Sequence, residues 1–169
     1  MGLSHWSASG NAAGVVLTVP AADTIHLVRL YNVHACPNTG PYDYKASQYM
    51  ACRAEGGVMY RVYDLDPTKV HLFLLNPARP SFVRKQIIDQ QPLSDAAKER
   101  VQLYIDRRLR EGAFEDPHDC DYRVYVFPAE GNIELSKPPK LKGIGRKHRY
   151  VRLVHLRMGR EFVEPIAGY

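Results

Sequence analysis

With 169 residues, 45% of them hydrophobic and 24% charged, the chain has the size and composition of one globular domain. Its three cysteines are an odd number at irregular spacing, which argues against a disulfide framework and favours a reducing, cytoplasmic compartment. No run approaches about 18 apolar residues, so we expect no transmembrane helix and no membrane partner.

The first 20 residues are expected to form a poorly ordered tail, followed by a single domain over residues 21–169. The apolar stretch at residues 12–19 is short, is interrupted by Gly14 and Thr18, and has no basic residue before it. We therefore do not assign it as a signal peptide.

The first half of the domain is predicted to be rich in strands. Residues 25–33 alternate apolar and polar side chains and predict a strand. Residues 42–54 are ambiguous between a short helix and a strand. Residues 58–65 and 70–75 predict two strands, and the turn residues at 64–69 favour an antiparallel pair. Because residues 70–75 are almost continuously apolar, we expect a central strand buried on both faces.

The clearest helix is predicted over residues 95–111. Ser94 is a favourable N-cap, and Gly112 is the glycine expected after a helix end. One apolar stripe follows the helical period, and its members are Ala97, Val101, Tyr104, Ile105 and Leu109. Arg108 falls in the same stripe. We expect its side chain to extend out to solvent, the alternative being a buried and paired arginine.

Further strands are predicted at residues 122–127, 133–135 and 149–156. Residues 137–148 contain too much Pro and Gly for regular structure. The order of elements predicts an α+β fold, with a curved, mostly antiparallel sheet or small β-barrel and one main covering helix.

Basic residues are concentrated near the C-terminus. The net charge is +5 and the isoelectric point is near 9.1. Nine basic residues and no acidic one lie in this segment: Lys137, Lys140, Lys142, Arg146, Lys147, Arg149, Arg152, Arg157 and Arg160. The rest of the chain has 14 basic residues against 18 acidic ones, a net charge of −4. This asymmetry predicts a polyanionic partner, with Lys140, Lys142, Arg146, Lys147 and Arg149 as phosphate contacts. The alternative is a solvated loop.

The tetrapeptide Tyr-Arg-Val-Tyr occurs twice, beginning at residues 60 and 122. On a strand Arg61 and Tyr63 share a face, as do Arg123 and Tyr125. If these faces line a groove, the arginines suit phosphates and the tyrosines suit bases. Chance repetition of good strand formers is the alternative.

No complete catalytic, cofactor or metal motif is present, and we expect neither a cofactor nor a metal. The His-x-Cys units at residues 34–36 and 118–120 lack the spacing of zinc sites. Asp64 and Asp66 flank a strand end, but no lysine has the spacing of a nuclease motif. His71, His118 and His155 have no convincing catalytic partner. Whether the chain is an enzyme stays open.

Residues 49–53, the strand at 57–63, the helix at 95–111 and the strand at 122–127 together resemble the PUA-like group of small barrels, which includes the ASCH and EVE domains. The resemblance covers residues 25–156 and concerns topology. It implies binding of RNA or DNA, and in some branches recognition of a modified base in an aromatic-lined pocket, where tyrosines would stack on the base.

Three hypotheses remain, in descending order. The first is a nucleic-acid-binding module that binds DNA or RNA. The second is a nuclease or other nucleic-acid-processing enzyme of a bacterial defence or restriction system. The third is a protein-interaction domain whose basic segment is incidental.

Overall fold

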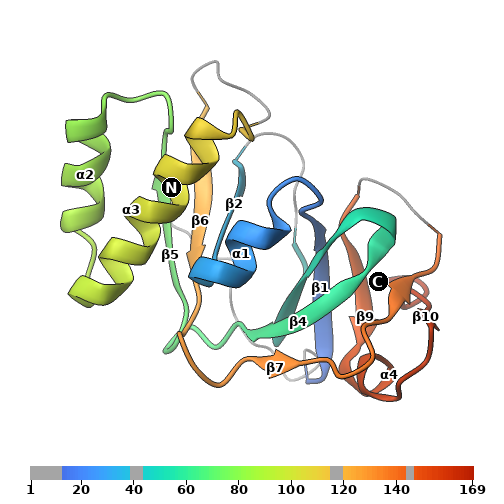
Figure 1. Cartoon of the computed structure of the whole chain (residues 1–169). Helices are drawn as coiled ribbons and strands as arrows, with labels where there is room; N and C mark the ends of the chain where they lie inside the picture. The colour runs from blue at the N-terminus through green and yellow to red at the C-terminus, as the bar shows by residue number, and fades with distance from the viewer. Residues whose placement is uncertain (1–12, 39–43, 115–119, 144–146) are drawn as a thin grey trace. The chain divides into compact units, whose positions relative to one another are not determined.

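The structure is a computed structural model, and it describes residues 13–38, 44–114, 120–143 and 147–169 (Figure 1). The chain divides into two compact units. The first comprises Met1–Ile25, Asp43–Lys69 and Glu130–Tyr169, and the second comprises His26–Tyr42 and Val70–Ala129. The chain passes from one unit to the other after residues 25, 42, 69 and 129. The single domain expected over residues 21–169 stays a prediction, and each unit is described by itself.

The first unit is built on a five-stranded sheet. Its strands are β1 (Val15–Pro20), β3 (Tyr49–Arg53), β4 (Met59–Asp64), β7 (Ile133–Glu134) and β9 (Arg149–Arg152). Their order in the sheet is β7-β4-β3-β1-β9. β1 runs parallel to β3 and antiparallel to β9, whereas the pairs β3–β4 and β4–β7 are antiparallel. The sheet is therefore mixed.

β1 corrects the expectation of a poorly ordered tail for residues 15–20. Its residues 15–19 are all buried, and it lies in the interior of the sheet. A strand with neighbours on both sides and cover on both faces reads as a continuous apolar run, without the alternation of a half-exposed strand. Residues 1–12 lie outside the described part of the chain.

A second layer of the same unit covers one face of this sheet. It contains β8 (Lys140–Leu141), β10 (Phe162–Val163), the helix α4 (Leu153–Arg157) and the single turn η1 (Glu55–Gly57). β8 and β10 are parallel. The apolar core between the layers consists of Val16, Ala51, Met59, Val62, Leu135, Leu141, Val151, Leu156 and Val163. Gly57 has φ +79°, and a Cβ there would meet the Leu141 carbonyl oxygen at 3.3 Å, so glycine permits the close approach of η1 to β8.

The C-terminal elements differ from the prediction in three places. Residues 137–148, expected to be irregular, contain β8. Residues 149–156, expected to be one strand, form β9 and then turn into α4, with Leu156 buried in the core. β10 was not predicted.

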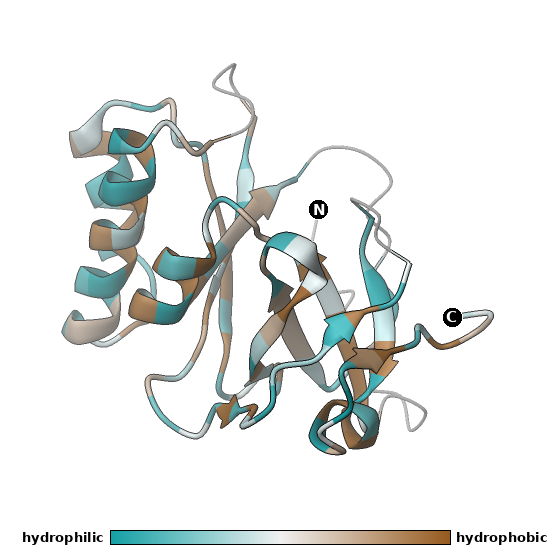
Figure 2. Cartoon of the chain, turned by 45° about the vertical axis from the view of Figure 1, so that its right-hand side comes forward, coloured by the Kyte–Doolittle hydropathy of each residue, from teal (hydrophilic) through white to brown (hydrophobic). Residues whose placement is uncertain are grey.

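The second unit is a three-stranded antiparallel sheet with helices. Its strands are β2 (Val33–Pro37), β5 (His71–Leu75) and β6 (Tyr122–Val126), in the order β2-β6-β5. Its helices are α1 (Ile25–Tyr31), α2 (Ser81–Asp89) and α3 (Asp95–Arg110). Hydrophobic and hydrophilic residues alternate along α2 and α3 in Figure 2, as expected of helices with one buried side.

The predicted helix over residues 95–111 is confirmed as α3. The Ser94 hydroxyl accepts a hydrogen bond from the Ala97 backbone N–H, which makes it the N-cap. Ala97, Val101, Tyr104 and Ile105 are buried, whereas Leu109 is 36% exposed. Four of the five stripe residues therefore face the core.

Arg108 is buried, which corrects the expectation that it extends to solvent. It is 4% exposed. Its Nη1 donates to the Ala35 carbonyl at 2.6 Å and to the Tyr104 hydroxyl at 3.0 Å, and its Nε donates to the Ala113 carbonyl at 2.9 Å. The guanidinium carbon lies 4.3 Å from the centre of the Phe114 ring. Arg108 thus fastens α3 to β2 and to the chain that follows the helix.

Residues 25–33 are not one strand. They form α1 and the start of β2, separated by Asn32 in the left-handed region with φ 52°. The adjacent residues Leu27 and Val28 are both buried, which a helix allows on one side but a half-exposed strand does not. The alternation of apolar and polar residues along this stretch led to the incorrect prediction of a strand.

Strands at residues 58–65 and 70–75 are confirmed as β4 and β5, but they do not pair with each other. β4 pairs with β3 and β7, while β5 pairs with β6. β5 is the outer strand of its sheet, and Leu74 is 36% exposed, so the expected central position is wrong. α2 was not predicted.

The α+β class is confirmed. The described residues contain four α-helices, in place of the one main helix expected, and no sheet among them closes into a barrel. No helix in the described ranges has the length and apolar character needed to cross a membrane.

Candidate functional site

The basic segment near the C-terminus belongs to the first unit. Most of its described cations are exposed: Lys137, Lys140, Lys142, Lys147, Arg152, Arg157 and Arg160. Arg149 is half-buried on β9. Arg146 lies outside the described residues. Lys140 and Lys142 stand on or next to β8, whereas Lys147 and Arg149 lead into β9, so the predicted contacts come from two strands of the unit.

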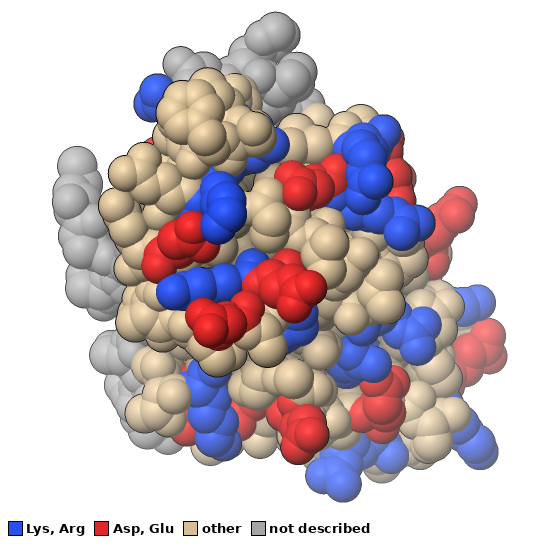
Figure 3. All heavy atoms as spheres, turned by 60° about the vertical axis from the view of Figure 1, so that its left-hand side comes forward, with Lys and Arg blue, Asp and Glu red and all other residues tan. Residues whose placement is uncertain are grey.

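The charge of this segment is almost uncompensated. Within the described ranges, Lys142 is the only one of these cations with an ion-pair partner, the Glu164 carboxylate at 2.7 Å. At least five of the 14 cations elsewhere in the chain pair with acids, as Lys69 does with Asp64 at 2.9 Å and Lys85 with Asp89 at 2.6 Å. Figure 3, which looks onto the side of α2 and α3, shows the two signs of charge interspersed. The basic segment lacks this mixing.

Like charges are brought together where β3 ends and β9 begins. Arg53 is opposite Pro20 of β1, and Arg149 is opposite Thr18. Since these β1 residues are two apart, both arginines lie on the same face of the sheet. Arg53 is 4% exposed and donates to the Lys147 carbonyl.

The ionisation of this cluster reflects the crowding. Burial lowers the pKa of Arg53, and the charge of Arg149 lowers it further. Burial likewise lowers the pKa of His148, with smaller contributions from Arg149, Arg53 and Lys147. The neighbouring charges therefore repel one another, and an anion placed among them would relieve the repulsion.

Aromatic rings are interleaved with these cations. The ring of His148 lies 5.0 Å from that of Tyr44 and 5.8 Å from that of Tyr150, and Tyr169 packs 4.8 Å from Tyr150. The Lys45 ammonium lies 5.2 Å from the centre of the Tyr169 ring. Tyr150 is buried, whereas Tyr44 and Tyr169 are half-exposed. We call Tyr44, Lys45, Arg53, Lys147, His148, Arg149, Tyr150 and Tyr169 the β9 cluster.

Much of the β9 cluster was not predicted. The sequence showed the cations and an excess of tyrosine, 11 residues, but not which tyrosines approach the basic segment. Tyr44 and Lys45 precede β3 in a stretch whose structure was ambiguous. The high tyrosine content was the available signal.

The two Tyr-Arg-Val-Tyr copies lie in different units, one in β4 and one in β6. Tyr63 and Tyr125 are each 1% exposed, so their rings offer no open face for stacking. Arg61 forms an ion pair with Glu134, and Arg123 donates to the Asn38 side-chain oxygen at 2.6 Å. Both arginines therefore have a polar partner within the chain.

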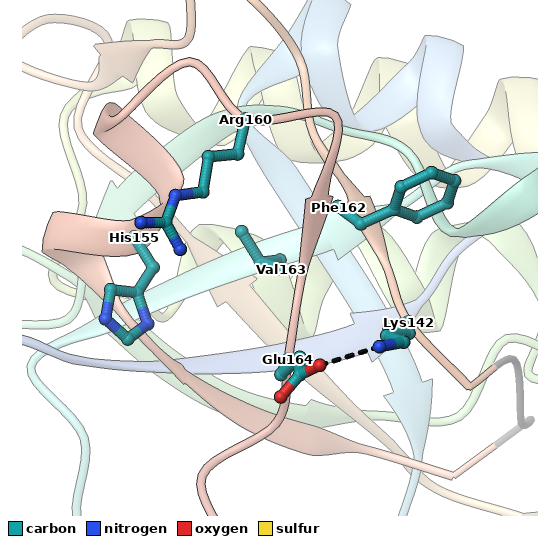
Figure 4. A pocket seen from close by; sticks show the side chains of 6 residues that line it. All are labelled: Lys142, His155, Arg160, Phe162, Val163 and Glu164. Atoms are coloured by element: carbon teal, nitrogen blue, oxygen red, sulfur yellow. Dashed lines mark hydrogen bonds and ion pairs between the residues drawn. The ribbon is translucent and has the colours of Figure 1, made fainter.

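A pocket of about 440 Å³ opens beside β10 in the first unit (Figure 4). Its lining residues are Lys142, His155, Arg160, Phe162, Val163 and Glu164. The hydrogen bond from Lys142 lowers the pKa of Glu164 and the same bond raises the pKa of Lys142, so both are charged near neutral pH. Of these residues, the prediction included only Lys142 as a contact.

The acids considered for a nuclease stabilise a turn. The Asp66 side chain accepts hydrogen bonds from the Thr68 backbone N–H and hydroxyl, and Asp64 pairs with Lys69. The Thr68 bonds lower the pKa of Asp66. His71 contacts the Gln91 side-chain oxygen at 2.9 Å.

One half of the paired His-x-Cys units can be described. His34 and Cys36 lie in β2, whereas His118 is outside the described residues. His34 is 3% exposed, its ring stacks 6.2 Å from that of Tyr125, and neither ring nitrogen has a hydrogen-bond partner among the described residues. Burial, and to a smaller extent Arg108, lower the pKa of His34 to about 3, so this imidazole is neutral. No group of three metal-ligating side chains occurs in the described part of the chain.

No family model matches the chain, and neither a curated protein nor a solved structure is detectably similar to it.

Proposed function

We propose that this protein binds nucleic acid through the β9 cluster and the exposed cations of the basic segment. One observation carries the proposal. One of the eight described cations between Lys137 and Arg160 pairs with a carboxylate, against at least five of the 14 cations elsewhere in the chain. A surface of one sign attracts a polyanion and releases its counterions on binding.

The aromatic rings favour nucleic acid over other polyanions. Tyr169 lies beside the Lys45 ammonium, His148 lies near Arg149, Arg53 and Lys147 and contacts Tyr44, and the rings of Tyr44 and Tyr169 are partly exposed. A cation next to an aromatic face serves both parts of a nucleotide, because phosphate takes the charge and the base stacks on the ring. A PUA-like fold, which we also propose within the α+β class, implies the same class of ligand.

A charge-matched pair of variants tests the proposal. Lys147→Ala/Arg149→Ala/Arg152→Ala removes three cations from β9 and the segment before it. Lys85→Ala/Arg107→Ala/Arg110→Ala removes three exposed cations from α2 and α3, which changes the net charge equally. Binding of labelled single- and double-stranded oligonucleotides is measured by fluorescence anisotropy from 50 to 200 mM salt, and circular dichroism checks folding.

The β9 variant is expected to bind more weakly and to lose about two units of the slope of log K against log salt, because each phosphate contact contributes about 0.7–0.9. The α2–α3 variant should retain nearly all of the affinity and slope. Equal behaviour of the two variants would show that only overall charge matters and would remove the β9 cluster from the binding surface.

No observation on the described residues favours the nuclease alternative. Asp64 and Asp66, the acids that suggested it, are engaged in the turn after β4.

A further inference from the structure

The pocket beside β10 presents different chemistry on its different sides. Figure 4 shows the Arg160 side chain extending toward His155, which projects from α4, while the ring of Phe162 lies on the other side of β10 and points away from Arg160. The ion pair of Lys142 and Glu164, 2.7 Å long, occupies a third position. A cationic side and an aromatic side thus share one cavity.

Five of the six lining residues are exposed. Phe162 is 51% exposed on a two-residue strand, a large apolar surface in water. Arg160 and His155 are exposed, and neither has a carboxylate partner within the described ranges. Val163 is buried and forms an apolar floor. The side chains of Lys142 and Glu164 are 65% and 71% exposed, so they can donate and accept further hydrogen bonds.

These groups match the parts of a nucleotide. The guanidinium of Arg160 suits a phosphate, the ring of Phe162 suits the face of a base, and the Lys142–Glu164 pair offers a donor and an acceptor to a base edge. The volume of about 440 Å³ lies in the range of small-ligand sites and accommodates one nucleotide unit, not a helix.

We infer that the pocket beside β10 holds one unpaired nucleotide of a single strand bound by this protein. A base inside a duplex is stacked on both faces and cannot stack on a protein ring, so occupation of the pocket selects single strands or unpaired ends. The inference rests on the proposed nucleic-acid binding. It adds a preference for single strands to that function, because the β9 cluster alone would bind the phosphates of single-stranded and double-stranded nucleic acid.

The variants separate the effect of the aromatic ring of Phe162 from the effect of an apolar side chain. They also separate the effect of the positive charge of Arg160 from the effect of side-chain size. Phe162→Leu removes the ring and Phe162→Tyr keeps it, while Phe82→Leu, at a phenylalanine that is 71% exposed on α2, is the matched control. Arg160→Gln removes the cation, with Arg107→Gln as its control. Anisotropy is measured with a labelled single strand, the same sequence as a duplex, and unlabelled nucleoside 5′-monophosphates as competitors.

Phe162→Leu and Arg160→Gln should each weaken single-strand binding by about fivefold or more, the loss of one stacking or phosphate contact. Phe162→Tyr and both controls should bind like the unchanged protein, and Phe162→Leu should leave duplex binding unchanged. Unchanged single-strand binding by Phe162→Leu and Arg160→Gln, while the β9 variant still loses affinity, overturns the pocket and leaves the proposed function standing. Failure of the unchanged protein to bind any oligonucleotide overturns both. If a free nucleoside 5′-monophosphate competes as well as the same concentration of unlabelled single strand, the pocket binds free nucleotides, and its assignment to a nucleotide of a strand is wrong.

Discussion

Arg108 offers the sharpest test of how the second unit is held together. It is a cation at 4% exposure that donates hydrogen bonds to neutral oxygens: the carbonyls of Ala35 and Ala113 and the hydroxyl of Tyr104. Arg108→Met keeps an unbranched side chain of similar reach and removes the donors. The substitution therefore isolates the hydrogen bonds from the packing.

The expected loss follows from these three bonds. A hydrogen bond to a charged group contributes about 1.5–3 kcal/mol, so the gross loss approaches about 5–9 kcal/mol. Removing a buried charge returns several kcal/mol of desolvation cost. The balance is a destabilisation of about 2–4 kcal/mol, which for a chain of 169 residues lowers the melting temperature by about 2–4 °C per kcal/mol.

Urea unfolding followed by circular dichroism measures this loss. Arg110→Met is the matched control, because Arg110 is exposed on the same helix and should change stability by less than about 0.5 kcal/mol. Tyr104→Phe, alone and combined with Arg108→Met, should show a coupling of about 0.5–1 kcal/mol, since the two side chains share a bond of 3.0 Å. A loss below about 0.5 kcal/mol for Arg108→Met would mean that the arginine is solvated and does not fasten α3 to β2.

Two further predictions concern the second unit. Ile105→Ala should cost about 2–5 kcal/mol in urea unfolding because Ile105 is fully buried on α3, whereas Leu109→Ala, at 36% exposure, should cost clearly less; equal losses would contradict the assigned buried face. His34 has a folded pKa of about 3 against an ordinary value of 6.5, so the unfolded chain takes up a proton that the folded chain does not; stability should therefore be full above pH 6.5 and fall toward pH 3, by at most about 1.4 kcal/mol per pH unit. His34→Phe should remove this part of the slope, and identical pH profiles of the two proteins would refute the burial of a neutral imidazole.

Signals within the sequence of a single element, such as caps and periodicity, were enough to predict α3 but not α1. α3 has an N-cap at Ser94, a glycine after its end and an apolar stripe that fits the helical period, and these three signals agree. α1 has seven residues and no acidic residue in its first turn, and its apolar positions also fit alternation. A helix of this length depends on tertiary packing, which its sequence alone does not reveal.

The pairing of the strands could not be predicted from the sequence. The Asp and Pro residues at positions 64–69 do form a turn, with Asp66 bonded to Thr68, but the strands on either side join different sheets. Turn chemistry specifies a change of direction and not the partner of the next strand. β1 was missed for a related reason, because its partners β3 and β9 lie more than 30 and 130 residues away.

The candidate site was also only partly predictable from the sequence. Its charge is visible in the sequence, since the cations are neighbours along the chain. The aromatic contacts join Tyr44 to His148 and Lys45 to Tyr169, residues about a hundred positions apart, and depend on the pairing of β9 with β1. Conversely, the Tyr-Arg-Val-Tyr repeat suggested a ligand face, but strand alternation does not tell which face is covered, and the second tyrosine of each copy is buried.

The cations of β9 could also serve to protect the edge of the sheet. β9 is the outer strand of its sheet, and charged residues on outer strands prevent pairing with other chains. That role needs charge of either sign and needs no particular neighbours. Here the Tyr150 carbonyl already accepts a hydrogen bond from the Ile166 backbone N–H at 2.8 Å, so part of the edge is covered by the chain itself. Protection also gives no reason to place the buried Arg53 where Arg149 lowers its pKa. A polyanion accounts for both the single sign of the charges and their crowding, and for that reason we favour the binding role over edge protection.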